Sequence, residues 1–71
     1  MKICPYCEQS NVARVRLKSM PSVVFQMCYE CDSVWDNTLI ISDQNGTNFK
    51  SFMFNLGTKP NWEDIVFIEE I

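Results

Sequence analysis

The chain has 71 residues, with six Lys and Arg, nine Asp and Glu and no histidine, which gives a formal net charge of −3. A chain this short forms one domain and buries too little surface to be stable by packing alone, so we expect a disulfide, a metal or an oligomer to support it. Its 46% of apolar residues excludes a disordered chain, and the lack of a long apolar run excludes a membrane-spanning helix or secretion signal, so we expect a cytoplasmic protein that does not enter a membrane.

The first regular segment is a predicted β-hairpin. Residues 12–18 alternate between apolar side chains on one face and the cations Arg14, Arg16 and Lys18 on the other. Such alternation is typical of a half-buried strand. After a break that contains a proline, residues 23–27 form a second predicted strand that runs back along the first.

A third strand and a short helix are predicted next. Residues 34–41 are rich in β-branched and aromatic side chains, which favour a strand, and the polar segment 42–46 ends it. Residues 48–56 place apolar side chains at the i, i+3, i+4, i+7 spacing of an amphipathic helix. Thr47 is the predicted N-cap of this helix, and Gly57 is the predicted C′ residue.

The last twelve residues leave two possibilities open. A helical turn can begin at Pro60, whereas the second half of residues 60–71 is typical of a strand. We expect a single domain over residues 1–71. Within it, a metal-holding sheet covers residues 2–41 and a helical extension covers 47–71.

The four cysteines form two pairs with a metal-binding spacing. Cys4 and Cys7 are separated by two residues, as are Cys28 and Cys31, and twenty residues lie between the pairs. A two-residue gap lets a tight turn direct both sulfurs to one point, and the long insert has the length of a hairpin. Four thiolates then complete a tetrahedron around a metal, and a reducing cytoplasm disfavours disulfides. We therefore predict one structural Zn²⁺ per chain, with iron in the same cage left open.

Two kinds of catalysis are alternatives to a structural metal. The tetrapeptide from Cys4 to Cys7, Cys-Pro-Tyr-Cys, is the active-site motif of glutaredoxins, so a thiol redox protein that uses this pair is one alternative. A glutaredoxin motif opens a helix, however, whereas here a predicted hairpin and a second cysteine pair follow. A catalytic zinc keeps one position open for water, whereas four cysteines close the site. We therefore expect no enzyme activity.

With both pairs placed, the chain resembles the zinc ribbon superfamily over residues 2–41. The resemblance implies a small metal-stabilised α+β fold: a zinc ribbon with a three-stranded antiparallel sheet, followed here by a short helix and a C-terminal strand or helix. Zinc ribbons usually carry glycine after the second cysteine of each pair, where this chain has Glu8 and Asp32. Aspartate tolerates the left-handed backbone that glycine supplies. Trp35 lies close enough to Cys31 to pack beside the metal.

The second half carries a looser resemblance. Cys28-x-Glu-Cys-x-x-x-Trp35, followed by Phe49 and by Gly57-x-Lys-Pro-x-Trp62, is similar to small stand-alone bacterial zinc-ribbon proteins. Some of these are associated with immunity to contact-delivered toxins. The resemblance carries over no residue role except that of the four cysteine ligands.

Charge is divided unevenly along the chain. Residues 1–31 contain four cations and two carboxylates, a net of +2, whereas residues 32–71 contain two cations and seven carboxylates, a net of −5. An acidic surface with an aromatic anchor suits binding to a basic protein, such as a toxin domain. The predicted partner-binding residues are Trp62, Glu63, Asp64, Glu69 and Glu70.

The leading hypothesis is a non-catalytic zinc module that binds another protein, most concretely an immunity protein that neutralises a bacterial toxin. The alternative is a nucleic-acid-binding or transcription-associated zinc ribbon that uses Arg14, Arg16 and Lys18 to contact phosphates. A negative total charge disfavours this alternative, because nucleic-acid-binding domains are usually basic.

Overall fold

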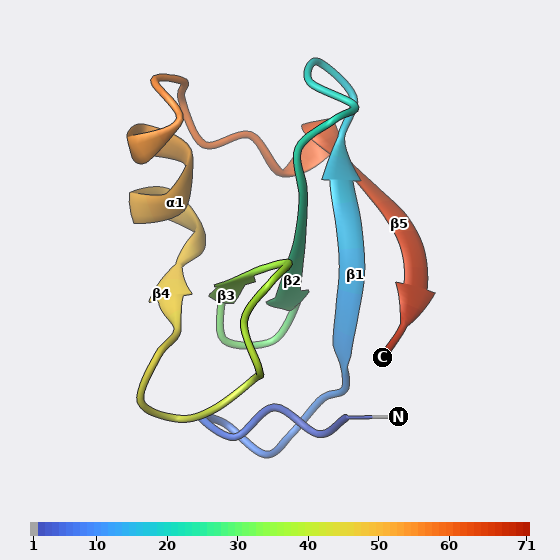
Figure 1. The fold of residues 1–71 in the computed structure, drawn as a ribbon, viewed down its shortest axis with the longest axis vertical. Coiled ribbons are helices and arrows are strands. Elements are labelled where there is room, and N and C mark those ends of the chain that lie inside the picture. The colour runs from blue at the N-terminus through green and yellow to red at the C-terminus, as the bar shows by residue number, and fades with distance from the viewer. Residues whose placement is uncertain (1) are drawn as a thin grey trace.

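The computed structural model describes residues 2–71 as one antiparallel sheet with a helix packed beside it (Figure 1). The strand order is β4-β3-β2-β1-β5. No helix within the described residues is long and apolar enough to cross a membrane. In chain order, the elements are β1 (Val12–Leu17), β2 (Val24–Cys28), β3 (Ser33–Asp36), β4 (Thr47–Asn48), α1 (Phe49–Asn55), the 3-10 turn η1 (Trp62–Asp64) and β5 (Ile65–Glu70).

The predicted hairpin is confirmed, and one face of it forms a core with α1. In β1 and β2, Val15 lies opposite Phe25, and side chains alternate between the two faces of the sheet. The amphipathic helix buries Phe49 and Met53 on the same face. We call this cluster the helix-side core; its buried residues are Ala13, Val15, Leu17, Phe25, Met27, Val34, Phe49 and Met53.

The opposite face of the sheet carries a second core. Val12 pairs with Cys28, and Gln26 pairs with Trp35, so these side chains lie on the face away from α1. Trp35 is fully buried. We call this cluster the cysteine-side core; its buried residues are Cys4, Val12, Cys28, Trp35 and Ile41.

The third strand is shorter than the prediction of 34–41. It ends at Asp36, whose carboxylate accepts hydrogen bonds from the backbone N–H and the hydroxyl of Thr38. The buried amide of Gln26 also donates to the carbonyls of Asp36 and Leu39, at 3.0 Å each. These hydrogen bonds hold residues 36–39 in a turn. They also give the buried amide of Gln26 the partners that a buried polar group requires.

The predicted helix is confirmed, but its N-cap is not Thr47. Asn48 caps the helix, with its side-chain oxygen 2.7 Å from the N–H of Ser51, while Thr47 pairs with Val34 in the short strand β4. Gly57 has a φ of 81° and ends the helix as expected.

Residues 60–71 contain both of the predicted structures, first a helical turn and then a strand. Asn61 caps η1, and the chain then enters β5, which pairs with β1 from Leu17↔Ile65 to Ala13↔Glu70. Figure 1 shows the segment after α1 crossing the sheet to reach β5 at the other edge. The sheet therefore has five strands rather than the three expected, because β4 and β5 extend the ribbon at both edges.

Candidate metal centre

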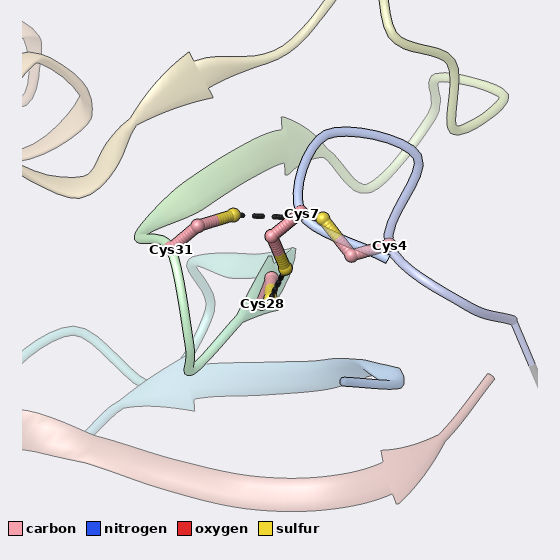
Figure 2. A group of neighbouring side chains, drawn as sticks. All are labelled: Cys4, Cys7, Cys28 and Cys31. Atoms are coloured by element: carbon pink, nitrogen blue, oxygen red, sulfur yellow. Dashed lines mark hydrogen bonds between the residues drawn. The ribbon is translucent and has the colours of Figure 1, made fainter. Parts of the chain in front are cut away.

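The two cysteine pairs lie on neighbouring turns at one end of the sheet. Cys4 and Cys7 belong to the loop before β1, Cys28 ends β2, and Cys31 precedes β3; all four side chains point to one centre (Figure 2). Backbone hydrogen bonds hold the first loop in place: the N–H of Cys4 donates to Ser10 and the N–H of Val12 donates to Lys2. The hairpin that the sequence predicted is what brings the pairs together.

The two turns have the same backbone design. In the first cysteine turn (residues 4–8), the N–H of Glu8 donates to the carbonyl of Cys4 at 2.9 Å; in the second cysteine turn (residues 28–32), Asp32 donates to Cys28 at 3.1 Å. Glu8 and Asp32 have φ values of 55° and 67°, both in the left-handed region. These are the two positions where zinc ribbons usually carry glycine. The chain adopts the same backbone with an aspartate, which tolerates it, and a glutamate, which does not favour it.

The sulfur positions match a four-coordinate metal. The Sγ atoms of Cys4 and Cys31 lie 3.5 Å apart, those of Cys7 and Cys28 lie 3.6 Å apart, and all four lie within 4.8 Å of one another. A tetrahedral thiolate site with bonds of about 2.3 Å has sulfurs about 3.8 Å apart. The cysteines are free rather than disulfide-bonded. The four predicted ligands are therefore brought together and fit one ion.

Burial and hydrogen bonds act in opposite directions on these thiols. Burial raises the pKa of Cys4, and it raises the pKa of Cys28 to about 12, because a thiolate is poorly solvated there. Burial acts on Cys31 in the same direction, but hydrogen bonds from Ser33 and from the Cys4 and Cys7 side chains together outweigh it and lower the pKa to about 7. Ser33 lies 3.1 Å from the Cys31 sulfur. A divalent cation would replace the protons of all four groups.

Two aromatic rings, Trp35 and Tyr6, lie beside the cysteines and contact the loop at Gly46; we call these two rings the aromatic cover. The sequence predicts no contact of Tyr6 or Gly46. Trp35 packs with Cys4 and Cys28 as expected, and its indole N–H donates to Ser42 at 2.9 Å. The ring of Tyr6 stacks on Trp35 at 5.7 Å, and its hydroxyl accepts from the N–H of Gly46. A Cβ at Gly46 would lie 2.8 Å from the Tyr6 ring, so a side chain there has no space. The sequence predicts only a turn for residues 42–46, and no signal in the chain marks their contact with Tyr6.

The predicted partner-binding residues do not form one continuous patch. Trp62 and Glu63 lie on η1, where Trp62 is 43% exposed. Asp64 accepts hydrogen bonds from the backbone and hydroxyl of Ser19. Glu69 and Glu70 are consecutive in β5 and therefore point to opposite faces of the sheet.

The predicted basic stripe is partly neutralised. Arg14 forms an ion pair with Glu69 and also donates to the side chain of Asn37. β5 lies directly beside the strand that carries Arg14 and Arg16, and the N–H of Lys18 donates to the carbonyl of Asp64. Glu69 of β5 therefore neutralises Arg14, one of the three cations that the nucleic-acid alternative requires, whereas Arg16 lies opposite Val66.

Comparison of the chain with models of protein families, with curated proteins and with solved structures found no match. The geometry itself shows a small α+β fold with a five-stranded antiparallel sheet. Four cysteines lie on it within metal-binding distance, an arrangement that fits a zinc-ribbon-like fold.

Proposed function

We propose that this chain is a non-catalytic zinc-binding module of the cytoplasm that acts by binding another protein. The convergence of four cysteine sulfurs at the spacing of a tetrahedral site supports this proposal most directly. Four thiolates fill the coordination shell of zinc and leave no position for water or substrate. The metal then stabilises the fold, and function depends on the surface.

The proposed partner is a basic protein, and its most concrete form is a bacterial toxin domain that this chain neutralises. Two considerations support this choice: residues 32–71 carry a net charge of −5, and the chain resembles small zinc-ribbon proteins of the toxin-immunity type. An acidic inhibitor is attracted to the basic cleft of a nuclease and associates rapidly through electrostatic steering.

The metal assignment is tested by elemental analysis of the purified protein. We expect about one zinc per chain and no stoichiometric iron. A matched sample of the double variant Cys28→Ser, Cys31→Ser should contain neither metal, because two ligands cannot complete the site. Stoichiometric iron in the parent protein would contradict the zinc assignment, and a metal-free folded protein would contradict the structural role.

The partner assignment is tested by co-expression with basic bacterial toxin domains, beginning with any that the reading frames beside its gene encode. We expect the chain to restore growth and to elute with the toxin domain from a size-exclusion column. Glu63→Lys should slow association several-fold, whereas Glu8→Lys, a change of equal charge in the first cysteine turn, should have a smaller effect. Continued toxicity with no detectable complex would refute the immunity role.

The thiol redox alternative has less support, because Cys4 and Cys7 lie among four sulfurs that point to one centre. The nucleic-acid alternative also has less support, because Arg14 already pairs with Glu69. Binding of a duplex at physiological salt that Arg16→Ala abolishes would nevertheless favour nucleic acid.

A further inference from the structure

Three aromatic rings from three separate segments meet on the surface of the molecule. The ring of Trp62 lies 4.7 Å from that of Phe49 in α1 and 6.3 Å from that of Tyr29 in the second cysteine turn. Phe49 is buried, whereas Trp62 and Tyr29 are 43% and 45% exposed. We call Tyr29, Phe49 and Trp62 the aromatic surface.

Both exposed rings of this surface have neighbours that support them. The side chain of Asn61 accepts from the N–H of Glu63, which fixes the turn that carries Trp62, and Phe49 supports the indole from below. Tyr29 lies between the ligands Cys28 and Cys31, so a bound metal fixes the backbone on both sides of it. Rings that are already ordered lose little entropy when a partner binds, which favours their use as contacts.

The charges around the aromatic surface select a cation. Glu30 follows Tyr29 and Glu63 follows Trp62, whereas one cation, Lys50, follows the buried Phe49; all three charged residues are exposed, and the carboxylates stand beside the two exposed rings. The faces of aromatic rings carry partial negative charge and attract Lys and Arg. Nucleic-acid bases also stack on exposed rings, but the two carboxylates would repel the phosphates.

We propose that the aromatic surface holds an arginine side chain of the basic partner protein, with Glu30 and Glu63 as its hydrogen-bond acceptors. This inference rests on the proposed function and specifies its contact. Arginine is favoured over lysine because its planar guanidinium stacks on rings and can reach two acceptors at once. Because Tyr29 belongs to the second cysteine turn, the metal shapes part of the contact as well as the fold.

The test uses a blocked pentapeptide with two arginines, Gly-Arg-Gly-Arg-Gly, and its twin in which citrulline replaces arginine. Citrulline keeps the shape and loses the charge. Binding to the zinc-loaded chain is followed by NMR through the indole N–H of Trp62 at about 150 mM salt, where long-range attraction is screened. We expect the arginine peptide to shift this signal and to bind at least about 10-fold more tightly than the citrulline peptide.

Two leucine variants separate the ring faces from the charges. Trp62→Leu and Tyr29→Leu keep apolar bulk. Each should lower the affinity for the arginine peptide by about 3- to 10-fold, as the loss of a cation–π contact predicts. Because Trp62→Leu removes the indole reporter, its binding is followed through the backbone N–H of Glu63. Ile40→Ala, which changes a side chain that is 87% exposed elsewhere, should bind normally. All variants should retain one zinc per chain.

Three outcomes would overturn the inference. These are equal binding of the citrulline peptide, unchanged binding by both leucine variants, and tighter binding of a thymidine oligonucleotide that depends on Trp62. If a toxin domain binds and the leucine variants bind it normally, the proposed function stands and the arginine contact fails. If the arginine peptide binds as expected and no basic protein does, the contact stands and the proposed function fails.

Discussion

The two cores lie on opposite faces of one sheet and differ in what holds them together. The eight buried residues of the helix-side core are all apolar, so burial of hydrocarbon alone accounts for its cohesion. The cysteine-side core has five buried residues, and Cys4 and Cys28 among them are candidate ligands. The first core therefore depends on packing, whereas the second gathers sulfurs that a bound cation would join in place of their protons.

This difference shows how a short chain supports a two-faced sheet. α1 packs beside β3 and β4 on one face, where its Phe52 ring also contacts Phe25 of β2, and no second helix within the described residues covers the other face. Trp35, Tyr6 and the loop around Gly46 take that place beside the cysteines. On the proposed function, a metal would supply the cohesion that a second helix would otherwise provide.

The largest expected effect is that of Cys28→Ser, which removes one ligand and leaves a polar group in the cysteine-side core. Binding of a structural zinc contributes about 10–16 kcal/mol of apparent free energy, which is as large as the whole stability of a typical domain, about 5–15 kcal/mol. We expect the variant to be unfolded at 25 °C, as should the parent protein in excess chelator. Circular dichroism measures both, and a folded metal-free chain would show that packing alone suffices.

A change in the helix-side core should weaken the protein and leave its metal in place. Phe49→Ala empties a buried ring position and should lower the free energy of unfolding by about 3–5 kcal/mol. Urea titration measures the loss, and elemental analysis should still find one zinc per chain. Phe54→Ala, which alters an exposed ring on the same helix, is the control and should change stability by less than about 0.5 kcal/mol. Loss of zinc from folded Phe49→Ala would show that the cores are not separable.

The aromatic cover can be tested through Gly46. In Gly46→Ala the new Cβ meets the Tyr6 ring at 2.8 Å and Trp35 at 3.0 Å, so the loop must move. We expect this overpacking to lower the free energy of unfolding by about 1–3 kcal/mol. The near-ultraviolet circular dichroism signal of Trp35 should change as well. Gly57 has open space around it and a φ of 81°, which strains any residue with a Cβ. Gly57→Ala should therefore lower the free energy of unfolding by about 1 kcal/mol and leave the Trp35 signal unchanged.

The smallest expected effect is a gain. Glu8 has a left-handed backbone, which lowers the free energy of unfolding by about 1–2 kcal/mol when the residue carries a side chain. Glycine avoids this cost, but its greater freedom in the unfolded chain lowers the free energy of unfolding by about 0.4–1 kcal/mol. Glu8→Gly should therefore raise the free energy of unfolding by up to about 1 kcal/mol in a urea titration. Gln9→Gly is the neighbouring control and should not stabilise. A destabilised Glu8→Gly protein would show that the Glu8 side chain makes a contribution beyond its backbone.

The sequence was sufficient for features that depend on local spacing. Alternation around Val15 predicted the hairpin, the cysteine intervals predicted the four-sulfur cluster, and Gly57 marked the end of the helix. The missing glycines at Glu8 and Asp32 pointed to left-handed positions that the structure contains.

Features that depend on distant partners were not predicted. The strand expected through residue 41 ends at Asp36 because Gln26, on another strand, binds the carbonyls that follow. The apolar run in β5 identified a candidate strand but not β1 as its neighbour. The role of Gly46 depends on contacts with Tyr6, forty residues earlier, which no local pattern encodes.

The place of β5 in the sheet has a consequence for folding. β1 gains its neighbour β2 across a short turn, but it gains β5 from the far end of the chain, where Ala13 meets Glu70. Closing so long a loop costs more entropy than closing the hairpin, so the β1–β2 pair can form first and the β1–β5 pair later. β5 is an edge strand with four exposed residues, so it also belongs to the part of the sheet that opens most readily. Amide exchange should therefore be faster along β5 than along β2, although both strands border β1.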